Sequence, residues 1–194
     1  EFVQKFKNYL LDLNIKEEER FAVLLPNSSL MVLLFLSIIA TKRVFVPINP
    51  KCTPNEIDYI LNDSQAVYLL TDTNQKTKVE KLHSYVETAL IPKYSEFVKD
   101  IFSRNSDKVI DQKQTDGNLG AEIIYTSGTT GDPKGVLLTH KNMLEDSFCL
   151  GKMFAFNENN KFLTVSPLFH NSGQIITTLA PLWAGGKTTA VRSD

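Results

Sequence analysis

A short run of hydroxyl and glycine residues, Thr126–Gly131, is the part of the sequence best suited to binding an anion. Its glycines let backbone N–H groups turn inward, and its hydroxyls can donate hydrogen bonds to phosphate oxygens. Lys134 follows closely and supplies a mobile positive charge suited to a terminal phosphate. These residue types predict a phosphate-binding loop, although the same types are also common in ordinary surface loops.

The spacing of the glycines excludes two familiar nucleotide-binding patterns. A Walker loop needs Gly, four further residues and then Gly-Lys-Ser/Thr, whereas Gly128 is followed three residues later by Gly131. A second near match, Gly186-Lys187-Thr188, would need glycine at position 181, where Pro181 stands. The run also lacks the Gly-x-Gly pair that opens a Rossmann fingerprint. A P-loop ATPase or kinase is therefore a poor interpretation.

Strand-like and helix-like segments alternate along the chain and must position this loop. Strands are expected at about 21–25, 44–46, 66–70, 121–125, 162–165 and 188–191. Helices are expected at about 2–13, 28–42, from 53, from 139 and at 172–183, with 77–104 helical in parts and interrupted at Pro92. The alternation predicts an α/β fold of mainly parallel β-sheets layered with helices, in which a polar loop at about 107–120 joins two α/β halves.

The segment Tyr125–Val136 resembles the signature loop of the adenylate-forming enzymes: acyl-CoA synthetases, adenylation domains of peptide synthetases, and luciferases. Leu25–Ser28 and Pro47–Pro50 resemble the family's upstream segments in order and spacing. Ser166–Gly173 and Leu182–Gly186 resemble segments that follow the loop. The resemblance covers nearly the whole chain. It implies that residues 1–194 are part of the large N-terminal AMP-binding domain, with the adenine-binding segment, the ribose-binding aspartate and the C-terminal domain with its catalytic lysine absent.

The resemblance also implies a reaction and a set of site residues. A carboxylate would attack the α-phosphorus of Mg-ATP to give an acyl-adenylate, and the thiol of CoA would then displace AMP. ATP, Mg²⁺ and CoA are the implied cofactors, no metal site of the protein's own is expected, and the isolated chain is not expected to complete a turnover. Lys134 and His170 are the implied catalytic residues. The implied phosphate-binding residues are Thr126, Ser127, Gly128, Thr129, Thr130, Gly131 and Lys134.

Two details favour a fatty or aryl acid as the substrate and CoA as the acceptor. Thr129 stands where peptide-synthetase domains more often have serine, and Pro167–His170 lacks the aspartate that would pair with an amino-acid ammonium. A peptide-synthetase adenylation domain, or a ligase that transfers the acyl group to a carrier protein, is the alternative enzymatic reading. A non-catalytic binding module that retains the fold is the alternative from a different class.

Composition limits the remaining classes. The 194 residues carry 21 basic and 22 acidic side chains, a net charge of −1, which argues against a nucleic-acid binder. The longest apolar run, Leu30–Ala40, is too short to cross a bilayer. Two cysteines without metal-ligand spacing favour a reducing compartment, so we expect a cytoplasmic protein, with peripheral membrane contact left open.

Several other residues receive an ordinary structural interpretation. His83 is expected on a polar helical segment, and Trp183 is expected in the core. Phe148, Met153, Phe154 and Phe156 could line an acyl pocket, but core packing is the stronger expectation for most of them.

Overall fold

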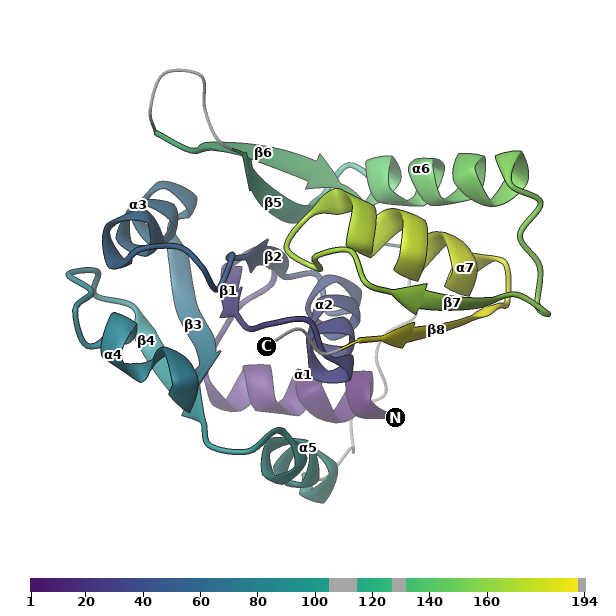
Figure 1. Cartoon of the computed structure of the whole chain (residues 1–194). Coiled ribbons are helices and arrows are strands. Elements are labelled where there is room, and N and C mark those ends of the chain that lie inside the picture. Colours follow the sequence, from purple (N-terminus) through teal and green to yellow (C-terminus); the bar gives the residue numbers. More distant parts are fainter. Residues whose placement is uncertain (105–114, 127–131, 192–194) are drawn as a thin grey trace.

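The computed structural model describes residues 1–104, 115–126 and 132–191, and Figure 1 shows their arrangement. The helices are α1 (Phe2–Asp12), α2 (Ser29–Ala40), α3 (Pro54–Ser64), η1 (Thr73–Gln75), α4 (Lys76–Val79), α5 (Tyr94–Ser103), α6 (His140–Met153), the π-helical η2 (Ser172–Leu179) and α7 (Ala180–Trp183). The strands are β1 (Arg20–Leu24), β2 (Val44–Pro47), β3 (Ala66–Asp72), β4 (Glu87–Ile91), β5 (Gly120–Thr126), β6 (Lys134–Thr139), β7 (Lys161–Thr164) and β8 (Lys187–Ala190). None of the described helices is long and apolar enough to cross a membrane.

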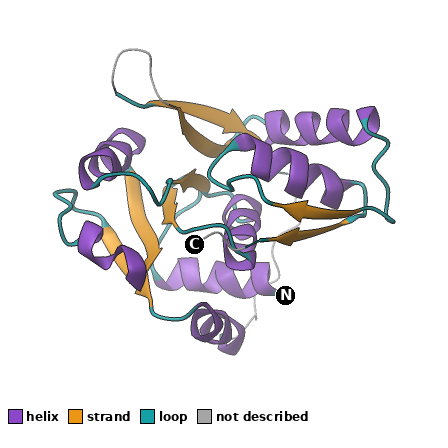
Figure 2. Cartoon of the chain, in the orientation of Figure 1, coloured by secondary structure: helices purple, strands orange, loops and turns teal. Residues whose placement is uncertain are grey.

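Six strands form one sheet in the order β4-β3-β1-β2-β5-β6, and β7 and β8 form a second. Every pair is parallel except β5 with β6, which is antiparallel. The predicted fold, mainly parallel sheets layered with helices, is confirmed (Figure 2). The strands β5 and β6 add to the first sheet, and the second sheet starts only after α6.

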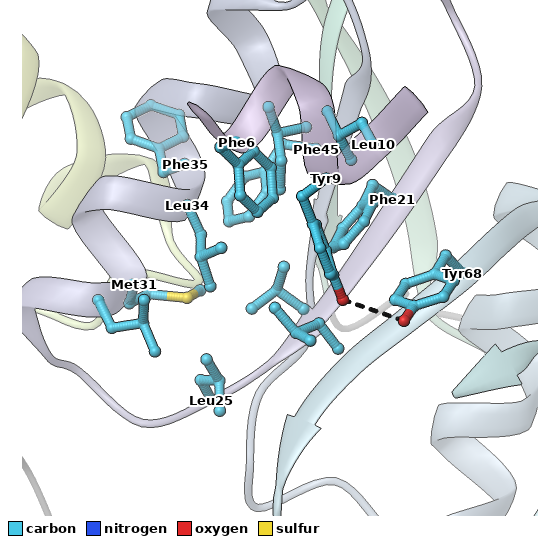
Figure 3. Packing of buried hydrophobic residues seen from close by; sticks show 14 of the residues in the cluster. Phe6, Tyr9, Leu10, Phe21, Leu25, Met31, Leu34, Phe35, Phe45 and Tyr68 are labelled. Carbon is cyan, nitrogen blue, oxygen red and sulfur yellow. Dashed lines mark hydrogen bonds between the residues drawn. The ribbon is translucent and has the colours of Figure 1, made fainter. Parts of the chain in front are cut away.

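Successive side chains of the central strand β1 point to opposite faces of the sheet, and β1 is buried on both faces. Phe21 and Val23 pack with α1 and α2, whereas Ala22 and Leu24 pack against the apolar side of α3. In the first of these cores the phenolic oxygens of Tyr9 and Tyr68 lie 3.1 Å apart and share a hydrogen bond (Figure 3). Helices on both faces explain why the strands read as continuous apolar runs rather than alternating ones.

Local capping fixes the helix starts where the sequence predicts them. The Thr53 backbone N–H donates to Glu56 Oε2 at 2.7 Å, and the Glu56 backbone N–H donates back to Thr53 Oγ1 at 3.3 Å, which forms a capping box. The Ser28 hydroxyl accepts from the backbone N–H of Met31 at the start of α2. Thr139 and Asn142 form a second capping box, so α6 follows β6 directly.

Two strands lie where the sequence predicts helix or loop. β4 occupies part of the segment expected to be helical, and it pairs in parallel with β3 from Tyr68–Glu87 to Asp72–Ile91. It is an edge strand with partly exposed side chains, so it lacks the apolar run of a central strand. β6 begins at Lys134, within the segment expected to be loop. His83 lies in the irregular segment between α4 and β4, where its own backbone N–H donates to the Asp58 carboxylate, so the prediction that places it on a helix is wrong.

The predicted core packing of four residues around α6 and α7 is wrong. Trp183 is 46% exposed, Phe148 45%, Met153 74% and Phe154 57%. Phe148 and Trp183 contact each other edge to face, with ring centroids 5.1 Å apart, on the outer side of the helices. Phe156 agrees better with the prediction, since it is half-buried and packs edge to face on Phe162 at 4.5 Å.

Candidate active site

The strands β2 and β5 are parallel neighbours, so their carboxyl ends lie side by side at the same end of the large sheet, here called its carboxyl edge. A cavity of about 290 Å³ opens at this edge. In open parallel sheets the carboxyl edge is where ligands bind, since the loops there can diverge and leave a crevice. The cavity is lined by Pro47, Asn49, Cys52, Glu56, Ile60, Tyr125, Thr126, Pro133, Phe169 and His170.

Two of the predicted site residues, Thr126 and His170, meet in this cavity although they come from distant parts of the chain. Lys134 pairs with Thr126 across the β5–β6 hairpin and is exposed, and the cavity lining includes its neighbour Pro133. The hairpin therefore places Lys134 opposite Thr126, the first residue of the predicted loop. Ser127, Gly128, Thr129, Thr130 and Gly131 lie outside the described residues.

Packing around Tyr125 sets the direction of the hairpin. The Tyr125 hydroxyl donates to Asp63 Oδ2 at 2.6 Å, which ties β5 to the end of α3. Burial first, and then the hydrogen bond to Asp63, raise the pKa of Tyr125, so the phenol stays neutral and acts as the donor. The ring crosses directly over Gly135, where an added Cβ would lie 3.0 Å from Tyr125 Cζ. Glycine at this position allows the close approach.

The segment that carries His170 is a tight turn between β7 and η2. The His170 backbone N–H donates to the carbonyl of Pro167 at 3.1 Å, and the N–H of Gly173 donates to the His170 carbonyl at 3.1 Å. A Cβ at Gly173 would lie only 2.4 Å from the Pro167 oxygen, so the turn requires glycine there. The His170 ring is exposed at the cavity and packs against Phe169, with ring centroids 4.7 Å apart.

Sequence reasoning did not identify Cys52 and Glu56 as cavity residues. Hydrogen bonds from the Thr53 backbone and hydroxyl lower the pKa of Glu56, so its carboxylate is charged and is engaged in the helix cap. Burial raises the pKa of the Cys52 thiol, which keeps it protonated. The available signal was positional, since both residues follow β2 and the neighbouring parallel strand β5 leads to the predicted loop.

The donor chemistry at this edge fits a nucleotide phosphate or a carboxylate. Thr126 contributes a hydroxyl at the entrance to the hydroxyl-rich run, and His170 contributes a ring nitrogen from the opposite side. Within the described ranges, no group of three or more His, Cys, Asp or Glu side chains could hold a metal ion. Mg²⁺ accompanying ATP would instead take its ligands mainly from phosphate oxygens and water.

One buried acid lies beneath the site. Glu122 on β5 is fully buried, and in the described part of the chain neither of its carboxyl oxygens has a hydrogen-bond partner of good geometry. Burial raises the pKa of Glu122 to about 8, and the amide of Gln174 on η2 offsets part of this effect. Burial therefore favours the neutral form of Glu122, which lies on the strand that leads to the predicted loop.

Comparisons with known proteins identify the family of the chain. The model of the AMP-binding enzyme family matches residues 1–194. The chain is 30% identical to an oxalate–CoA ligase of Arabidopsis thaliana over 92% of this chain and 36% of the relative. It is 30% identical to a mitochondrial malonate–CoA ligase of Xenopus laevis over 86% of this chain and 29% of the relative. The chain thus spans about a third of the length of these curated relatives.

The fold also matches solved structures. ATP-bound MatB from Rhodopseudomonas palustris superimposes with a TM-score of 0.86 at 22% identity, over 100% of this chain and 39% of that one. The family model extends over all the segments that line the cavity and over the hydroxyl-rich run. The chain therefore belongs to the AMP-binding enzyme family, the adenylate-forming enzymes.

Proposed function

We propose that the natural protein containing these residues activates a carboxylic acid with ATP and transfers the acyl group to CoA. In the first step a carboxylate oxygen attacks the α-phosphorus, and the bond to pyrophosphate breaks. In the second step the sulfur of the CoA thiol attacks the acyl carbon, AMP leaves with the bonding electrons, and the thiol proton passes to solvent. This chemistry requires alignment and charge neutralisation more than a protein nucleophile.

The observation that carries the proposal is the convergence of Thr126 and His170 on one cavity at the carboxyl edge of the sheet. Thr126 lies at the entrance to the hydroxyl-rich run, and His170 lies on the turn between β7 and η2. A nucleotide phosphate held by the run would therefore face a carboxylate oriented by His170. Lys134, paired with Thr126 across the hairpin, is proposed to stabilise charge on the departing pyrophosphate.

Two classes of carboxylic acid are proposed as the substrate. Phe169 and the turn Pro167–His170 support a fatty or aryl acid, because the turn itself has no acidic residue to pair with a substrate ammonium. The names of the relatives, an oxalate–CoA ligase and a malonate–CoA ligase, support a small dicarboxylate. A carrier-protein thiol is the alternative acceptor to CoA. The proposed location is the cytoplasm, and peripheral contact with a membrane is left open.

The test is carboxylate-dependent exchange of labelled pyrophosphate into ATP by the full-length natural protein. The panel includes oxalate, malonate, acetate, medium and long fatty acids, aryl acids and amino acids. Exchange with one acid class identifies the substrate, and Lys134→Ala is expected to lower the exchange rate about 100- to 1,000-fold, the cost typical of a lost transition-state charge contact. Lys99→Ala, on the exposed side of α5, is the matched control. A folded protein that exchanges with none of these acids would favour the non-catalytic binding module.

A further inference from the structure

The turn that carries His170 is held by a side chain far away in the sequence. Asn27, in the connection between β1 and α2, donates from Nδ2 to the carbonyl of Ser166 at 2.8 Å. Its Oδ1 accepts from the backbone N–H of Leu168 at 2.8 Å. The two bonds flank Pro167, which has no N–H to satisfy. One planar amide therefore fixes both ends of the tripeptide that precedes Phe169 and His170.

The peptide groups that Asn27 binds are in the interior. Asn27 is only 4% exposed and Leu168 only 1%. A buried N–H without a partner costs about 1–3 kcal/mol, so the Leu168 amide depends on this contact. The Leu168 carbonyl is satisfied by a second side chain, Gln174 Nε2, at 2.7 Å. Leu168 is thus bound on both sides by side-chain amides rather than by a neighbouring strand.

The position of Asn27 is itself fixed. The following residue, Ser28, caps α2 through the backbone N–H of Met31, and the preceding β1 is the central strand of the sheet. The amide therefore projects from a rigid part of the molecule onto an otherwise irregular segment. Val165, the residue directly before the tripeptide, is 66% exposed, so burial alone does not fix the approach to the turn.

We propose that Asn27 is a positioning residue, whose amide holds the backbone of Ser166–Leu168 and thereby sets where Phe169 and His170 stand at the cavity. The role in turnover rests on the proposed function, whereas the placement of the turn does not. Asn27 does not line the cavity, so it acts through the turn and not on a ligand.

The placement is tested in the 194-residue chain by NMR. Asn27→Ala is expected to speed hydrogen exchange of the Leu168 amide about tenfold or more, because its only described acceptor is lost. The protein has three histidines, so the ring signals of His83 and His140 serve as internal references for that of His170. The His170 signal is expected to shift or broaden while the other two stay in place.

Two further variants separate placement from general destabilisation. Asn27→Asp keeps an acceptor for Leu168 but loses the donor to Ser166, so the Leu168 amide is expected to stay more protected than in Asn27→Ala. Thr71→Val removes a different buried bond, from the Thr71 hydroxyl to the Leu24 carbonyl at 2.7 Å, and is expected to leave the Leu168 amide and the His170 signal unchanged. An unchanged Leu168 amide in Asn27→Ala, or an equal response in Thr71→Val, would overturn the proposal.

The consequence for turnover is tested by a double-mutant cycle in the full-length protein, with the acid that supports pyrophosphate exchange. Asn27→Ala is expected to lower kcat/KM for the acid about tenfold alone and less than about twofold when His170 is already alanine, because coupled residues are not additive. The full tenfold loss in the His170→Ala background would overturn the positioning role. Absence of pyrophosphate exchange in the wild type, together with faster hydrogen exchange of the Leu168 amide in Asn27→Ala, would reject the proposed function and still support the placement.

Discussion

The buried carboxyl group of Glu122 predicts an unusual dependence of stability on pH. Its pKa is raised from an ordinary value of 4.5 to about 8 in the folded protein, mainly by burial. Between these two pH values the folded state therefore holds a proton that the unfolded state has lost. Stability that is fully present below pH 4.5 is lost as the pH rises, and the loss is complete above about pH 8.

The magnitude follows from the same two values. One pKa unit corresponds to about 1.36 kcal/mol, so the rise from 4.5 to about 8 makes the free energy of unfolding about 5 kcal/mol lower above pH 8 than below pH 4.5. That is a large share of the 5–15 kcal/mol typical of a domain. Glu122→Gln keeps the size and the neutral form of the side chain, so this contribution disappears from the variant.

Urea unfolding of both proteins between pH 4.5 and 8.5 measures the effect, with m-values checked for two-state behaviour. The free energy of unfolding of the Glu122→Gln variant minus that of the wild type is expected to rise steadily across this pH range. Glu145→Gln, an exposed acid on α6, is the matched control and is expected to follow the wild type. A difference between Glu122→Gln and the wild type that stays constant within about 1 kcal/mol from pH 5 to pH 8 would refute the reasoning.

Two further variants test the local structure at the site. Gly173→Ala is expected to destabilise the fold by about 2 kcal/mol or more and to displace the His170 turn, because the new Cβ would lie 2.4 Å from the Pro167 oxygen. Thermal unfolding measures the loss of stability, and the His170 NMR signal reports the displacement. A stability equal to that of the wild type would contradict the predicted steric contact. Thr53→Ala is expected to cost about 1 kcal/mol by removing the α3 capping box, as measured by urea unfolding, whereas Thr53→Ser, which keeps the cap, is expected to lose much less.

The parts of the fold that the sequence predicts correctly are those with strong local causes. Thr53, Pro54 and Glu56 form a complete helix start, and the capping box appears as expected. β1 and β2 are buried on both faces, so their apolar runs are unmistakable. β4 and β6 were missed because they are edge strands with partly exposed side chains, and their pairing partners, not their composition, make them strands.

The candidate site divides in the same way. Thr126 and His170 could be predicted because each lies in a distinctive local motif, and the structure brings them to one cavity. Cys52 and Glu56 carry no such motif, and only the parallel pairing of β2 with β5 brings them there. The exposed faces of Phe148 and Trp183 could not be predicted, because helical spacing alone does not say which side of a helix is covered.

The strand order also has a consequence for synthesis on the ribosome. β1 is the first of the described strands in chain order, yet it occupies the middle of the sheet, between β3 and β2. About 50 residues separate the end of β1 from the end of β3. At a typical translation rate of about 5–20 residues per second, the edge of β1 that pairs with β3 waits roughly 3–10 seconds, whereas β2 is made sooner and can cover the other edge. The nascent chain thus exposes one edge of a buried apolar strand until β3 is made, which makes early chaperone contact valuable for this topology.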